Sequence, residues 1–412
     1  MAQIKRLSLL LILLCTLLLV PTFSRACTSI IISGKATPDG RPILLKNRDT
    51  GTLSNMCVVC QGVRYRFLGL VNAKDAAAKE VWAGHNEAGF AIMNTAAYNL
   101  NAKDEKLEKE GILMRQALSQ CATLADFEQM LDTLSRPMCV DANFGVLDAQ
   151  GGCAYYEVGN QSYRKYDAND SVTAPGGYLI RTNYGMSGDM SDPHGVERYA
   201  AISELMAGLH ARGAFDIASL LTIPHYLRHG VTHTDLLAQM PADAETDRMV
   251  CFRDYIPRYI TASCMLIQGV ASGQNPAQTT SWTYVGYPLT TVAVPLMITR
   301  SGHLPAIVSP DQEGRSWLAT EGLRLKGALF CLKQGNTHDY LNLSRLVNRD
   351  GTGILQLTKP VQDSILAHSH RVLGSLSPRE KPAKSIDALY DWIDAYVKSQ
   401  MLAIDSRVMP HD

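Results

Sequence analysis

Short apolar runs rich in β-branched residues alternate with turn-forming clusters from residue 27 to about residue 295. The first run is Thr28-Ser-Ile-Ile-Ile-Ser33, and Pro38-Asp39-Gly40 separates it from the second, Pro42-Ile-Leu-Leu45. This alternation predicts two strands joined by a tight turn, and Asp148-Ala-Gln-Gly151 marks a similar hairpin further on. Further strand-like runs lie at 56–59, 64–69, 80–85, 90–95, 142–147, 153–158, 178–182, 262–269 and 290–297.

Apolar residues recur with helical spacing in several other windows. These windows are 104–119, 123–134, 195–209, 214–221, 315–334, 359–373 and 384–403. The last three lie in the final hundred residues, where Asp311 and Ser385 are suitable residues near helix starts and 378–382 reads as a linker. The pattern predicts an α+β fold of antiparallel sheets with helices packed outside, followed by a helical C-terminal extension over 306–412.

The first 26 residues have the pattern of an export signal. Lys5 and Arg6 precede an apolar stretch, Leu9–Val20, and small residues stand at Ser24 and Ala26, just before Cys27. The stretch is shorter than the roughly 20 residues of a membrane span. We therefore expect a signal peptide over 1–26, a folded domain over 27–305, and a protein that is periplasmic or secreted, without a transmembrane segment.

The amino-acid composition is that of a globular protein and argues against nucleic-acid binding. The chain has 412 residues, of which 46% are hydrophobic, and its 39 basic and 39 acidic residues give a net charge of zero. Such a chain is globular and lacks the basic field that nucleic-acid binding requires. Nine of its ten cysteines follow the signal segment, so intramolecular pairing would leave at least one free thiol.

The predicted N-terminal hairpin gives Cys27 distinctive surroundings. If residues 36 and 41 face each other at the turn, Cys27 lies opposite residue 50 within two positions, close to Lys46-Asn47-Arg48-Asp49-Thr50. Neighbouring cations favour the thiolate form of a thiol. A chain that starts at Cys27 also carries an α-amine with an ordinary pKa of about 7.7–8.0, so one residue combines a nucleophile with a base.

Several segments in the same order resemble the cysteine-type N-terminal nucleophile hydrolase superfamily. They are Cys27-Thr28-Ser29, Asp39-Gly40, Asn47-Arg48-Asp49, Gly84–Ala91, Asn143–Asp148, Arg181–Tyr184, Arg198, and Trp282 with Gly286-Tyr-Pro288. The superfamily includes choloylglycine hydrolases, penicillin V acylases and acid ceramidases, and the chain is most similar to its isopenicillin-N acyltransferase-like branch, which includes acyl-CoA:6-aminopenicillanic acid acyltransferase. The resemblance covers roughly residues 27–300 and implies a four-layer αββα sandwich.

The resemblance also implies roles for individual residues. Cys27 is the expected nucleophile, and Asp49 takes the position of the aspartate that holds the amine and thiol. Family members usually have arginine three residues before this aspartate, where this chain has Lys46, so the cation beside the thiol is either Lys46 or Arg48. Lysine keeps the charge but lacks the planar fork of arginine.

Two more sites complete the set that the resemblance implies. Asn183 matches the asparagine whose side-chain amide stabilises the oxyanion, and Arg198 matches the downstream arginine that supports the site. The second oxyanion donor is Asn94 or Tyr98, and the spacing does not decide between them. The implied reaction is amide cleavage or acyl transfer through a thioester, with no metal and no organic cofactor.

The sequence leaves alternatives open. Cys27 is also compatible with lipid attachment in an exported binding protein or with a structural disulfide. A papain-like peptidase would use Cys121, Cys139 or Cys251 together with a distant histidine. The substrate remains open among penicillins, bile-acid conjugates, N-acyl amino acids, ceramide-like amides and small peptides, and a homo-oligomer is neither indicated nor excluded.

Two spacings suggest other chemistry. Cys57-Val-Val-Cys60 has the spacing of a redox motif, but its surroundings predict a strand, on which these thiols face opposite sides. His225, His229 and His233 are spaced as metal ligands on one helix face, but Gly230-Val-Thr232 interrupts such a helix. We therefore expect neither a redox centre nor a metal site here.

Overall fold

The computed structural model describes residues 27–101, 108–379, 381 and 384–409. The predicted signal peptide, residues 1–26, and the beginning of the helix predicted over 104–119 lie outside the described residues. No helix among the described residues combines the length with the apolar character that a bilayer crossing requires.

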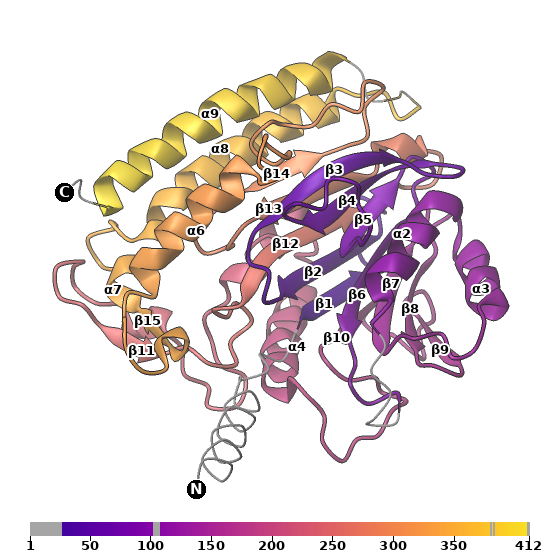
Figure 1. The fold of residues 1–412 in the computed structure, drawn as a ribbon, viewed down its shortest axis with the longest axis horizontal. Coiled ribbons are helices and arrows are strands. Elements are labelled where there is room, and N and C mark those ends of the chain that lie inside the picture. Colours follow the sequence, from indigo (N-terminus) through magenta and orange to yellow (C-terminus); the bar gives the residue numbers. More distant parts are fainter. Residues whose placement is uncertain (1–26, 102–107, 380, 382–383, 410–412) are drawn as a thin grey trace, which may run out of the picture.

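Two antiparallel sheets form the centre of the fold (Figure 1). The first sheet has the strand order β10-β1-β2-β12-β13-β14. Its strands are β1 (Thr28–Ile32), β2 (Ile43–Asp49), β10 (Tyr178–Arg181), β12 (Thr261–Gln268), β13 (Thr280–Val285) and β14 (Ala293–Leu296). The second sheet is a meander in chain order: β3 (Asn55–Gln61), β4 (Arg66–Asn72), β5 (Ala83–Asn86), β6 (Ala91–Ala96), β7 (Ala142–Leu147), β8 (Cys153–Val158) and β9 (Tyr163–Asp167).

Successive side chains of a strand point to opposite faces of its sheet, so the apolar residues form three buried layers: one between the two sheets and one on the outer side of each sheet. In β1, Ile31 packs between the two sheets, whereas Ile30 and Ile32 face the helix α4 (Val196–Ala211) on the outer side of the first sheet. The outer side of the second sheet packs against α2 (Glu110–Gln120) and α3 (Leu124–Thr133). Helices therefore cover both outer faces of two facing sheets, which confirms the predicted αββα sandwich.

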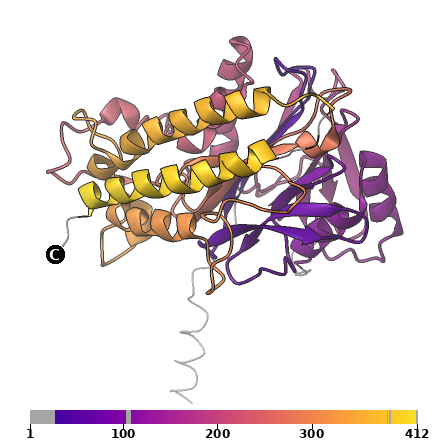
Figure 2. The same ribbon diagram turned by 90° about the horizontal axis from the view of Figure 1, so that it is seen from above.

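The C-terminal helices pack along one side of the sandwich (Figures 1 and 2). They are α6 (Trp317–Leu329), α7 (Leu343–Leu346), α8 (Ile354–Gly374) and α9 (Lys384–Val408). Two short strands, β11 (Met249–Cys251) and β15 (Tyr340–Asn342), form a separate ribbon, and α5 (Ile217–Leu220) is a single turn. Single 3₁₀ turns occupy Ile223–His225, Leu237–Gln239, Pro276–Gln278 and Thr337–Asp339.

The local predictions are confirmed where apolar residues dominate. The strands over 142–147 and 153–158 match β7 and β8 at both ends. The strand β13 was missed because its hydroxyl residues Thr280, Ser281 and Thr283 are buried rather than exposed. The helix predicted to start at 359 begins at Ile354 instead, where Gln356 accepts a hydrogen bond from the backbone of Gly353.

The helix predicted over 214–221 is wrong for most of its length. Only Ile217–Leu220 is helical, because the chain then enters a 3₁₀ turn that ends at His225. His229 and His233 follow on irregular backbone, with His233 in the left-handed region at φ 56°. The three histidines therefore do not share a helix face.

Candidate active site

The first hairpin brings the end of β2 next to Cys27. Thr28 pairs with Asn47 and Ser29 pairs with Lys46, and continuing this register places Cys27 beside Arg48, within the predicted two positions. Because side chains alternate along a strand, Cys27 lies on the same side as Ser29, between the sheets. Cys27 is free and buried, and its Sγ lies 3.8 Å from the backbone oxygen of Asp49.

Lys46 is a buried cation within electrostatic reach of this thiol. Its Nζ donates to the carbonyl of Trp82 at 2.8 Å and to Oδ1 of Asn94 at 2.7 Å. Burial lowers the pKa of Lys46 to about 8, and Cys27 is the largest influence in the opposite direction. A buried ammonium group thus stands close to the candidate nucleophile.

Arg48 points to other partners. Its guanidinium donates to Oδ1 of Asn55 at 2.7 Å and to Oδ1 of Asn72 at 2.9 Å, and lies 4.8 Å from the ring centre of Trp82. These contacts connect the end of β2 to the neighbouring ends of β3 and β4. They support a structural role for Arg48 at this end of the two sheets.

Arg198 connects Cys27 to Asn183. Ser29 pairs with Arg181, so the same register places Asn183 beside Cys27 on the other side of β1. From α4, the guanidinium of Arg198 donates to the carbonyl oxygen of Cys27 at 2.5 Å and to Oδ1 of Asn183 at 2.8 Å. One buried cation therefore orients both the backbone of the candidate nucleophile and the side-chain amide beside it.

The start of α4 is shaped for this guanidinium. Gly195, the residue that caps the helix, has φ 80°, and a Cβ added there would lie 2.2 Å from Nη2 of Arg198. Glycine is needed at this position both for its left-handed backbone and for the close approach of the side chain.

Asp49 is fully buried and bound on both carboxylate oxygens. Its Oδ1 accepts from the hydroxyl of Thr261 at 2.6 Å, and its Oδ2 accepts from Nε of Arg258 at 2.9 Å. Asn47 also donates to Oδ1 at 3.3 Å. The contact between Asp49 and Cys27 thus runs through the backbone oxygen of Asp49, and its carboxylate faces Arg258.

Sequence reasoning missed Arg258 and Thr261. Both precede the strand predicted over 262–269, and no local pattern distinguishes Arg258 from the other arginines of the chain. The hydroxyl of Thr261 also accepts from the backbone N–H of Arg258 at 2.8 Å, so the two residues form one unit around the carboxylate. Only the pairing of β12 with β2, in which Thr261 lies opposite Asp49, reveals this contact.

A buried ion pair supports the segment that carries Asn183. Nε of Arg181 lies 2.8 Å from Oε1 of Glu157, and both side chains are almost fully buried. Glu157 also accepts from the backbone N–H groups of Met186 and Ser187 at 2.8 Å. The strand before Asn183 and the loop after it are therefore attached to the same carboxylate.

The two candidates for the second oxyanion donor have different surroundings. Asn94 is buried and accepts from Lys46, whereas Tyr98 is 40% exposed and contacts the ring of His194 at 5.5 Å between centroids. The side-chain amide of Asn94 therefore belongs to the same buried network as Lys46, which favours Asn94.

Residues 36–257, more than half of the chain, match the family described as acyl-coenzyme A:6-aminopenicillanic acid acyl-transferase. The chain belongs to this family. The match confirms the resemblance to N-terminal nucleophile hydrolases, so the chain is an acyl-transferring or amide-hydrolysing enzyme of that type. The matched range begins after Cys27 and ends before Arg258.

Solved structures with similar chains bear related names. An N-acylethanolamine-hydrolyzing acid amidase ortholog from Caenorhabditis elegans is 18% identical, with a TM-score of 0.39 over 63% of this chain and 99% of that chain. Conjugated bile acid hydrolase from Clostridium perfringens is 10% identical, with a TM-score of 0.37 over 67% and 93%. Penicillin V acylase from Agrobacterium tumefaciens is 11% identical, with a TM-score of 0.34 over 66% and 87%. No curated protein matches the chain.

Burial disfavours a reactive thiolate at two other cysteines of this acyltransferase family member. Burial raises the pKa of Cys121 to about 12 and raises the pKa of Cys57 further, which disfavours the reactive thiolate form. Cys57 and Cys60 lie on β3, as predicted, and all nine described cysteines are free, so no disulfide involves Cys27.

Two of the three histidines considered as metal ligands have aromatic neighbours. His225 is bonded through Nε2 to the carbonyl of Pro288 at 3.0 Å, and its ring contacts Tyr284. The ring of His229 packs edge-on against Tyr255. Within the described stretches, no three His, Cys, Asp or Glu side chains gather as metal ligands.

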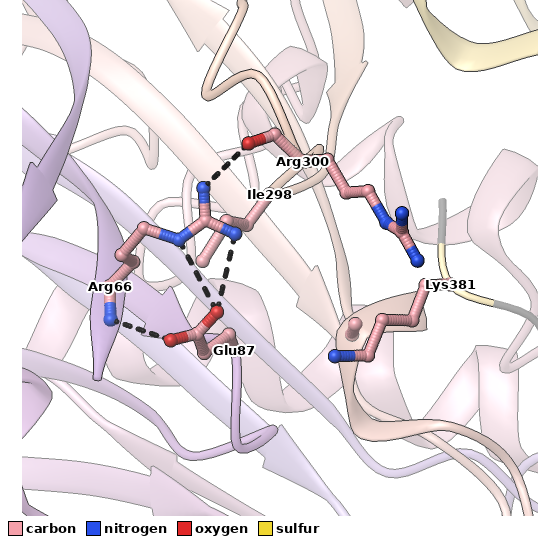
Figure 3. A pocket seen from close by; sticks show the side chains of 6 residues that line it. Arg66, Glu87, Ile298, Arg300 and Lys381 are labelled. Carbon is pink, nitrogen blue, oxygen red and sulfur yellow. Dashed lines mark hydrogen bonds and ion pairs between the residues drawn. The ribbon is translucent and has the colours of Figure 1, made fainter. Parts of the chain in front are cut away.

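A small pocket of about 120 Å³ lies elsewhere on the molecule (Figure 3). Its lining consists of Arg66, Glu87, Ala277, Ile298, Arg300 and Lys381, and Arg66 forms an ion pair with Glu87 at 3.3 Å. Arg66 begins β4, whereas Asn72, which contacts Arg48, ends it. Arg66 and Asn72 are six strand positions apart, which corresponds to roughly 20 Å. Because Asn72 lies at the end of β4 near Arg48 and Cys27, the pocket at Arg66 is separate from the candidate active site.

Proposed function

We propose that the mature protein begins with Cys27 and uses the thiol and α-amine of this residue to cleave or transfer acyl groups at amide C–N bonds. The observation that carries the proposal is the double contact of Arg198, which binds the backbone of Cys27 and the side chain of Asn183 with one guanidinium. A nucleophile and an oxyanion donor must keep a fixed relative position, and this arrangement supports one.

The reaction would proceed by covalent catalysis. The thiol proton of Cys27 passes to its α-amine as Sγ forms a bond to the amide carbonyl carbon. The α-amine then protonates the departing amine as the C–N bond breaks, which leaves a thioester on Cys27. Attack by water releases an acid, and attack by a second amine forms a new amide.

Two asparagines are suited to stabilise the oxyanion. The side-chain oxygen of Asn183 accepts from Arg198, and that of Asn94 accepts from Lys46. An amide that gives its oxygen to a cation presents its N–H groups on the opposite side, toward other acceptors. One N–H of Asn183 already donates to the carbonyl of Ala96 at 2.9 Å. We therefore propose the side-chain amides of Asn183 and Asn94 as the donors that stabilise the oxyanion.

Export belongs to the same proposal. Removal of the predicted signal peptide after Ala26 would create the free α-amine that the mechanism needs. The protein would then act in the periplasm or outside the cell, on a small-molecule amide. A lipid-attached Cys27 would have both its amine and its thiol blocked and could not perform this chemistry.

The first test is the intact mass and N-terminal sequence of the exported protein. We expect an unmodified chain that starts at Cys27; a diacylglyceryl modification or a retained upstream residue would contradict the proposal. The purified protein is then assayed with N-acylethanolamine, conjugated bile acid and penicillin V, and with acyl-CoA plus 6-aminopenicillanic acid to detect transfer.

The variant Cys27→Ala should lose turnover completely on whichever substrate the panel identifies. Cys331→Ala is the matched control, because Cys331 is an exposed free cysteine. Its activity should equal that of the unmodified sequence. Retained turnover in Cys27→Ala would exclude this cysteine as the nucleophile.

A further inference from the structure

A lysine of the C-terminal extension is buried close to the candidate active site. Lys326 lies in the last turn of α6 and is only 2% exposed. Its Nζ donates to the backbone carbonyl of Tyr259 and lies 4.0 Å from the ring centre of the same residue. The rings of Tyr287 and Phe330 are also nearby, at 4.8 and 5.8 Å. Aromatic faces attract a cation, so these rings form a box that favours the ammonium group.

Lys326 binds Tyr259, which is the neighbour in sequence of Arg258, the ion-pair partner of Asp49. Tyr259 directly follows Arg258, whose Nε contacts the carboxylate of Asp49 at 2.9 Å. The carbonyl of the next residue, Ile260, accepts from the backbone N–H of Thr50 at 2.9 Å. The short segment with Arg258 is therefore attached to the end of β2 on one side and to Lys326 on the other.

The charges also indicate that this lysine interacts with Asp49. Burial lowers the pKa of Lys326 to about 7, and Asp49 opposes this change by favouring the charged form. Burial and Asp49 together raise the pKa of Tyr287 well above its ordinary value. The hydroxyl of Tyr287 is buried and has no partner among the described residues. The charge of Asp49 therefore influences both Lys326 and Tyr287.

The helix that carries Lys326 is held closely against the first sheet. Gly286 has φ 95°, and a Cβ there would lie 2.9 Å from Cα of Ala319 in α6. A Cβ on Gly322 would lie 2.2 Å from the side chain of Thr291. Such close backbone approach gives α6 a defined position, so its lysine can determine the position of a neighbouring segment.

We propose that Lys326 is a positioning residue of the acyl-transfer site, holding the segment around Tyr259 so that Arg258 stays on Asp49. The C-terminal helices would then complete the active site rather than only cover the sheet. A buried ammonium group is expensive to desolvate, and an apolar side chain of similar length would fill the same space. The contacts with Tyr259 and the charge of Asp49 account for a lysine at this position.

This inference rests on the proposed function, so its test uses the mature enzyme and the substrate identified with Cys27→Ala as the inactive reference. The variant Lys326→Met keeps the length and removes the charge and the donor. We expect kcat to fall about tenfold or more, with KM within about threefold, because substrate contacts are retained while the site geometry is disturbed. Lys359→Met is the control, since Lys359 is exposed and pairs with the exposed Asp363 in the same helix, α8.

The possible results separate the two ideas. An active Cys27→Ala protein would refute the proposed function itself. An inactive Cys27→Ala protein together with a Lys326→Met kcat within twofold of the unmodified enzyme would overturn the role of Lys326 alone, as would a loss confined to KM. Circular dichroism and thermal unfolding establish that the variant is folded, and Lys326→Gln provides a second, polar replacement. If neither variant folds, Lys326 serves stability and the positioning role is rejected.

Discussion

Adding one methyl group at Gly195 should disturb the candidate oxyanion site without removing any functional group. The new Cβ would lie 2.2 Å from Nη2 of Arg198, whereas an ordinary contact begins at 3.4 Å, so the atoms must separate by about 1.2 Å. Nη2 is the atom that donates to Oδ1 of Asn183. Gly195→Ala should therefore break or lengthen the bond that orients the amide of Asn183.

The expected magnitude has two parts. An alanine at a left-handed backbone position costs roughly 1–2 kcal/mol, and a lost hydrogen bond to a charged group adds about 1.5–3 kcal/mol. A displacement of about 1 Å in catalytic geometry reduces turnover by on the order of a hundredfold. The matched control is Gly213→Ala, at the other end of α4, where φ is 62° and nothing lies within 4 Å of the added Cβ.

The assay compares kcat, KM and urea unfolding for the two glycine variants. Both should lose the backbone contribution to the free energy of unfolding, but only Gly195→Ala should lose the additional stability and most of its turnover. KM should change little, because the amide of Asn183 acts mainly on the transition state. If kcat of Gly195→Ala lies within threefold of that of Gly213→Ala, the assigned link from Arg198 to Asn183 is wrong.

Two further predictions concern buried charges. Burial lowers the pKa of Lys46 to about 8, so if its charge assists Cys27, kcat/KM should decline above about pH 8. In the unfolded chain the ordinary pKa of a lysine is about 10.4, so between about pH 8 and about pH 10.4 the unfolded state holds this proton and the folded state does not. The contribution of Lys46 to the free energy of unfolding should therefore rise with pH between these two values. Lys46→Arg should move the alkaline decline to higher pH in a profile of kcat/KM, and an unchanged profile would argue against a role for this charge. Glu157→Gln should lower the free energy of unfolding in urea by about 3–5 kcal/mol, because it leaves Arg181 buried without its counter-charge. The control Lys165→Met removes the exposed ion-pair partner of Glu128 and should change the free energy of unfolding by less than about 1 kcal/mol. Equal losses of stability in Glu157→Gln and Lys165→Met would contradict the reasoning.

The sequence by itself determined the local frame of the site. The β-branched run at Thr28 and the turn at Gly40 were sufficient to predict the first hairpin, because strand pairing and side-chain alternation depend on residues close in the chain. They placed Cys27 next to the segment 46–50, and the order of later motifs identified the superfamily. The same local logic predicted β7 and β8 at both ends, since their apolar residues and the turn between them are contiguous.

Tertiary structure decided which side chains meet. Lys46 and Arg48 lie on the same face of β2, so the alternation of side chains along the strand does not predict different partners for them. Their different partners come from the neighbouring strands, because Asn55 in β3 and Asn72 in β4 bind Arg48. Arg258 joins Asp49 only because β12 pairs with β2. Lys326 comes to the same region from a helix outside the matched family range. Such contacts depend on the packing of sheets and helices, which brings together residues such as Asp49 and Arg258 that are 209 positions apart and have no common local pattern.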